Sequence, residues 1–129
     1  MEHSHLMDKQ RKKELADSYR RMKVSIGVYQ VTNTANGKLF IDSCNNLKNR
    51  WLTLRLMLED GRHPNRAFQT EWTEAGADAF VYEVLEETEI EADLPPREKT
   101  QQLKEMKEKW LAEKQPFGAR GYNNKLSSE

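Results

Sequence analysis

The sequence has little of several features that would assign a protein to a class at once. It holds one cysteine in 129 residues, Cys44, and so no internal disulfide, which fits a reducing compartment. No apolar run approaches a membrane span of about 18 residues, and residues 1–10 lack the apolar segment of a secretory signal. We therefore expect a cytoplasmic protein that makes no membrane contact.

Apolar residues are also few, at 36% of the chain against 33% charged residues, so the core must be small. The length fits one domain. The net charge is zero, but residues 1–58 and 94–129 are basic and residues 59–93 are acidic. This distribution permits a face that attracts phosphate groups, and it equally permits solvated helix faces around one acidic loop.

The first half of the chain predicts a helix followed by a β-hairpin. Residues 8–22 have the pattern of a charged helix with a narrow apolar stripe, which we assign to an N-terminal extension over residues 1–23. Residues 24–32 alternate apolar and polar side chains, as a half-buried strand does, and residues 39–43 form its partner. Asn36-Gly37 between them is a strong hairpin signal. The folded domain is expected to span residues 24–126.

The second half predicts helices around one more strand. A helix begins after Ser43 or Asn45 and stops at residues 59–61, and a second runs from about Pro64, in its first turn, to Gly76. Residues 79–85 read as a strand, residues 86–96 as an acidic loop, and residues 97–114 as a long helix. The order predicts an α+β fold, a three-stranded antiparallel sheet flanked by helices.

One core is expected to hold this fold together. Its predicted members are the apolar side chains that recur at helix and strand spacing: Leu47, Trp51, Leu54, Phe68, Trp72, Phe80, Val84 and Trp110.

Several short motifs occur along this order with a characteristic spacing. They are Gly27-Val28-Tyr29, Phe40-Ile41-Asp42, NLKNRW at 46–51, GRHPNRAFQTEW at 61–72, AFVYEVLEE at 79–87 and Gly121-Tyr122-Asn123. Together they resemble the GIY-YIG nuclease family over about residues 25–124. The resemblance implies hydrolysis of a phosphodiester bond, with one Mg²⁺ or Mn²⁺ ion held by a glutamate.

The same resemblance implies roles for individual residues. Tyr29, Arg50 and Glu108 are the expected catalytic residues, and Glu108 is also the expected metal ligand. The expected substrate contacts are Lys38, Lys48, Asn123 and His63. We expect Lys38, Lys48 and Arg50 to share one basic face with Tyr29.

The sequence also departs from the family at three of these site positions. Phe40 stands where the second tyrosine belongs, Asp42 where the family keeps glycine, and Leu54 where several members place a histidine. The glutamate position is open: three residues before Trp110 stands Lys107, whereas an ungapped count back from Gly121 gives Glu108. If Lys107 is the equivalent residue, the chain lacks the carboxylate that would bind the metal ion.

These departures favour a nuclease-like protein with a degraded catalytic site. We expect it to act on nucleic acid, DNA rather than RNA, with weak or no cleavage and without a metal cofactor. One alternative is an active endonuclease that depends on a divalent metal. Another is a protein-interaction module that uses the acidic segment 86–93. The sequence leaves the oligomeric state open.

Overall fold

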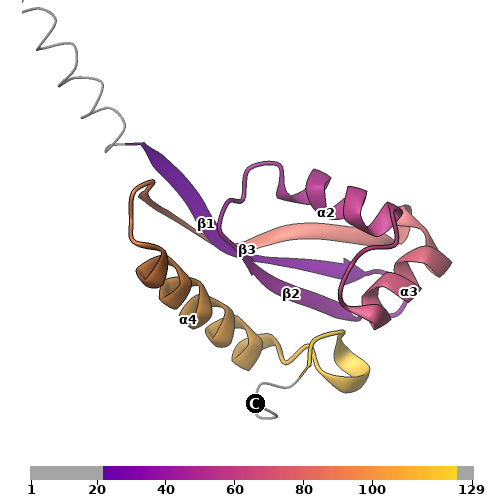
Figure 1. The fold of residues 1–129 in the computed structure, drawn as a ribbon. Coiled ribbons are helices and arrows are strands. Elements are labelled where there is room, and N and C mark those ends of the chain that lie inside the picture. The colour runs from indigo at the N-terminus through magenta and orange to yellow at the C-terminus, as the bar shows by residue number, and fades with distance from the viewer. Residues whose placement is uncertain (1–21, 125–129) are drawn as a thin grey trace, which may run out of the picture.

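The computed structural model describes residues 22–124, and Figure 1 shows their arrangement. Except for Met22, the helix predicted at 8–22 lies outside the described residues. The strands are β1 (Lys23–Asn33), β2 (Leu39–Cys44) and β3 (Phe80–Glu91). The helices are α2 (Arg50–Glu59), α3 (Arg66–Ala75) and α4 (Pro96–Lys114), with short 3₁₀ turns at Ala77–Ala79 and Gly118–Arg120. No helix within 22–124 is long and apolar enough to cross a membrane.

The three strands form one antiparallel sheet in the order β2-β1-β3, which confirms the predicted α+β class. The β1–β2 turn closes as predicted: Gly37 has φ 79°, in the left-handed region that favours glycine, and its amide donates to the Asn33 carbonyl at 2.7 Å. Helices α2 and α3 cover one face of the sheet and α4 the other (Figure 1).

Each face of the sheet has its own apolar cluster, whereas the sequence predicted a single core. The larger cluster, under α2 and α3, includes Leu54, Phe68, Trp72 and Phe80. The smaller one, under α4, contains Val28, Ile41 and Leu111, with Trp110 packed at its margin. Helical periodicity identifies which side chains point inward, but it does not say to which side of a sheet the helix packs.

The prediction for β3 was wrong at two points. The acidic residues after 85 continue the strand through Glu91, where they pair with the first half of β1, so only a short connection precedes α4. Ile90 is buried in this stretch. Val84, predicted to lie in the core, is 42% exposed and lines a hollow between β1, β3 and the loop before α2.

Two helix starts also differ from the predictions. Strand β2 continues through Cys44, so α2 begins only at Arg50, after Asn49 in a left-handed conformation with φ 58°. The side chain of Asn65 accepts a hydrogen bond from the Phe68 amide and caps α3, so Pro64 precedes the cap and is not in the first turn. Gly76 ends α3 as predicted.

Candidate functional site

A cleft of about 320 Å³ opens on the α2–α3 side of the sheet. It is lined by six of the residues that the sequence analysis singled out: Tyr29, Phe40, Asp42, Arg50, Leu54 and His63. They come from β1, β2, α2 and the loop before α3, so residues far apart in the sequence meet here. The structure therefore brings together the altered positions and three of the predicted functional residues.

Tyr29 lies in the central strand, two residues after a glycine that the packing requires. A Cβ atom on Gly27 would lie 2.0 Å from the Glu86 carbonyl oxygen of β3. Tyr29 is 2% exposed and its ring packs on Tyr82, with the ring centroids 5.4 Å apart. Burial, and then the neighbouring carboxylate of Asp42, raise the pKa of Tyr29 above its ordinary value. The hydroxyl is therefore held in its protonated form and is a poor general base near neutral pH.

Arg50, the first residue of α2, points its guanidinium over Tyr29, with 5.9 Å between the guanidinium carbon and the ring centroid. Its Nε donates to Cys44 Sγ at 2.8 Å, and that thiol donates to the Asn46 carbonyl at 2.8 Å. Cys44 thus orients the arginine, a role that the sequence analysis did not assign to it. The terminal nitrogens of Arg50 hydrogen-bond to no other described residue, and a guanidinium suits a phosphate.

His63 is 8% exposed and is packed between aromatic rings. Phe40 and Phe68 contact it edge-on, at centroid distances of 5.0 and 4.9 Å. Its Nδ1 accepts a hydrogen bond from the Asn65 amide at 3.0 Å, and burial lowers its pKa. His63 is therefore a neutral imidazole whose position is fixed by packing.

Asp42 lies opposite Tyr29 in the β1–β2 register. Its Oδ1 accepts a hydrogen bond from the Ser43 amide at 2.8 Å and forms an ion pair with the Lys107 ammonium at 3.1 Å. Asp42 shares the cleft side of β2 with Phe40, whereas α4 packs on the other face, so Lys107 reaches Asp42 around the edge of β2 that faces away from β1. Glu108, one residue further, is exposed and has no ionic partner among the described residues.

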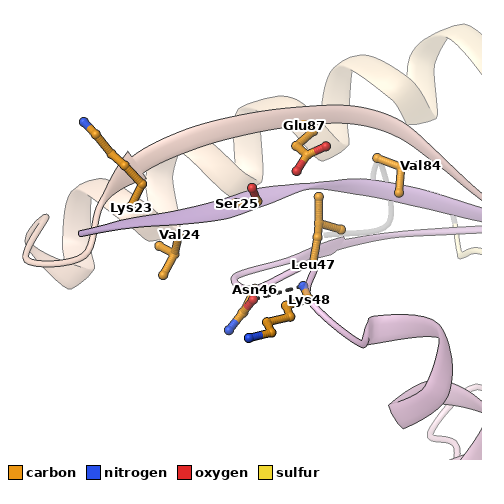
Figure 2. A pocket seen from close by; sticks show the side chains of 8 residues that line it. All are labelled: Lys23, Val24, Ser25, Asn46, Leu47, Lys48, Val84 and Glu87. Carbon is orange, nitrogen blue, oxygen red and sulfur yellow. Dashed lines mark hydrogen bonds between the residues drawn. The ribbon is translucent and has the colours of Figure 1, made fainter. Parts of the chain in front are cut away.

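Two predicted substrate contacts lie outside the cleft. Lys38 pairs with Glu71 at 3.1 Å, in a network that also joins Tyr122 to Glu71 at 2.6 Å. Lys48 lines a second hollow, of about 540 Å³, between β1, β3 and the loop before α2. Figure 2 shows Leu47 pointing toward the sheet there and Lys48 pointing away from it. The prediction that Lys38, Lys48 and Arg50 share one basic face with Tyr29 is therefore wrong.

Asn123 is bound to the edge of β2. Its side chain accepts from the Ile41 amide at 2.9 Å and donates to the Ile41 carbonyl at 2.7 Å, as a neighbouring strand would. Both of its polar atoms are thus occupied by backbone. The residue that lines the cleft is its neighbour Asn124, which the sequence analysis did not single out.

The donor set of the cleft does not fit the divalent metal ion that the resemblance implies. Within the described ranges, no three His, Cys, Asp or Glu side chains are grouped so that they could hold a metal ion. Asp42 is already paired with an ammonium group, and the Tyr29 oxygen is held protonated. A Mg²⁺ ion that keeps its waters still needs one or two free carboxylates, and Asp42, the carboxylate among the described residues that line this cleft, is already paired.

Comparisons with known proteins agree with this arrangement. No family model matches the chain. Intron-associated endonuclease 1 of Enterobacteria phage T4 is 31% identical over 83 residues, which cover 64% of this chain. The chain spans about a third (34%) of that curated relative's length.

Two solved structures of the catalytic domain of intron endonuclease I-TevI have the same fold, and one of the two is the structure of a mutant. They are 29% and 28% identical to this chain, each with a TM-score of 0.50. Each match covers 78% of this chain, and 93% and 98% of the two solved chains.

The fold and the cleft thus define a nuclease-type α+β domain. In sequence and in fold the chain is similar to the catalytic domain of intron endonuclease I-TevI, which agrees with its resemblance to the GIY-YIG nuclease family.

Proposed function

We propose that this chain binds nucleic acid through the cleft and cleaves it weakly or not at all. The observation that carries the proposal is the ion pair between Asp42 and Lys107, 3.1 Å long, at the edge of the cleft. It occupies the carboxylate of the cleft, so that no free acidic group is left among the described residues that line it to hold a metal ion. Arg50 nevertheless remains available to a phosphate group.

The altered residues also weaken the chemistry of cleavage. Phe40 lacks a hydroxyl, and the pKa of Tyr29 is raised by burial, so neither motif position offers an oxygen poised to accept a proton. Losing one donor placed where charge develops typically lowers the rate about 10²–10³-fold. Since the carboxylate of the cleft is also paired with Lys107, we expect cleavage to be close to the uncatalysed background.

DNA is the favoured substrate because one solved relative is a homing endonuclease, and homing endonucleases act on DNA. Binding is tested by fluorescence polarisation with labelled DNA and RNA duplexes of the same sequence. Wild type should bind DNA more tightly, with an affinity that falls steeply as salt rises. Arg50→Ala should bind about tenfold more weakly, since a hydrogen bond to a charged group is lost.

Arg66→Ala is the matched control, because Arg66 is exposed on α3 and does not line the cleft. If Arg50→Ala and Arg66→Ala weaken binding equally, the cleft is not the contact surface. Tighter binding to RNA would refute the choice of DNA.

The competing function is an active endonuclease that uses Glu108. It is favoured by one observation: Glu108 is exposed and unpaired within residues 22–124, so its carboxylate is free to bind a metal ion. Metal-dependent plasmid nicking by wild type that Glu108→Ala abolishes would establish it. A protein-interaction surface on segment 86–93 would lie mainly on the edge strand β3, because most of this segment is strand and not loop.

A further inference from the structure

The Asp42–Lys107 pair places a positive charge at the edge of the cleft. The Asp42 carboxylate is anchored by the Ser43 amide at 2.8 Å and, in turn, holds the Lys107 ammonium. The Lys107 and Asp42 side chains are 34% and 38% exposed, so the pair is partly shielded from water but still open to a ligand. An ammonium has three N–H donors, so a single ion pair with Asp42 leaves donors for a ligand.

We propose that the Lys107 ammonium is a fixed cation that takes the place of a divalent metal ion, so that the cleft binds a phosphate backbone without metal. This inference rests on the proposed function, because it concerns the same cleft. Arg50 and Lys107 provide two positive groups around one carboxylate, Asp42, and the cleft is thus cationic before any ion binds. A divalent ion entering beside Lys107 would be repelled by its charge.

The position of Lys107 supports this assignment. It stands three residues before Trp110, one of the two positions that the resemblance leaves open for the metal-binding glutamate, and its ammonium pairs with Asp42, which lines the cleft. Asp42 stands where the family has glycine, and it pairs with Lys107. The two departures therefore form one unit: a positive side chain replaces the metal ligand, and a new carboxylate positions it.

The test measures the affinity of the 129-residue chain for a fluorescein-labelled DNA duplex in EDTA and in Mg²⁺ at matched ionic strength. We expect wild type to bind at least as tightly in EDTA as in Mg²⁺, because Mg²⁺ only competes for the phosphates. Lys107→Glu should bind about tenfold more weakly than wild type in EDTA and should bind more tightly in Mg²⁺ than in EDTA. Lys107→Gln should lose affinity without gaining a response to Mg²⁺.

Lys104→Glu is the matched control. Lys104 lies one turn earlier on α4, is exposed, and pairs with no carboxylate in the part of the chain that the structure describes. The same change of charge there should weaken binding less, and Mg²⁺ should not restore it. If wild type requires Mg²⁺ to bind, or if Lys107→Glu behaves like Lys104→Glu, the inference is overturned. If wild type binds in neither condition, the proposed function itself fails.

Discussion

Replacing Gly27 by alanine should destabilise the sheet next to the cleft. The added Cβ would lie 2.0 Å from the Glu86 carbonyl oxygen and 2.8 Å from a methyl carbon of Leu47. The first contact is with backbone, so β3 must move away from β1 by roughly an ångström to reach an ordinary contact distance. Overpacking of this kind typically costs about 1–3 kcal/mol, and we expect the upper end because a strand must move.

The assay is urea unfolding followed by circular dichroism, with Gly61→Ala as the control. A Cβ atom added to Gly61 would have nothing within 4 Å, and the φ of this residue is 73°. Alanine there should cost only the left-handed backbone penalty of about 1–2 kcal/mol. If Gly27→Ala is no less stable than Gly61→Ala, the close approach of β3 to β1 does not hold in solution.

Three further changes test the packing and the charges. Trp72→Ala should lower the free energy of unfolding by about 3–5 kcal/mol in the same assay, since Trp72 is 4% exposed; a loss below about 1 kcal/mol would contradict its place in the core. Glu71→Gln should destabilise the fold mainly above the ordinary carboxyl pKa. A hydrogen bond from Tyr122, above all, lowers the folded-state pKa of Glu71, so the stabilisation by this carboxylate is lost as pH falls through that pKa. The urea midpoints of wild type and Glu71→Gln should therefore converge on acidification. A difference between them that stays constant with pH would refute this. Cys44→Ala should weaken DNA binding less than Arg50→Ala, because it removes only the thiol that orients the guanidinium; equal affinity to wild type would deny that role.

The fold could be predicted from the sequence where one local signal decided it. Asn36-Gly37 determined the hairpin, and Gly76 marked the end of α3. The extent of β3 could not be predicted in this way, because glutamates at 86–91 have low strand propensity and are held in the strand by pairing with β1. Tertiary contacts determined that residues 86–91 form a strand, whereas their local composition favoured a loop.

The candidate site shows the same division. Motif spacing identified Tyr29, Arg50 and His63, and the structure places all three in one cleft. Spacing did not decide between Lys107 and Glu108, because the choice depends on which face of α4 turns toward β2. Nor could it show that Cys44 orients Arg50, since a thiol and a guanidinium six residues apart meet only when the chain turns between β2 and α2.

Plasmid nicking in Mn²⁺ tests most directly whether the Asp42–Lys107 pair has replaced the metal site. The variants are wild type, Phe40→Tyr/Asp42→Gly, and the triple variant that adds Lys107→Glu. We predict that wild type and the double variant nick no faster than buffer with Mn²⁺, and that the triple variant nicks measurably faster. Robust nicking by wild type that is abolished by Glu108→Ala would contradict the account.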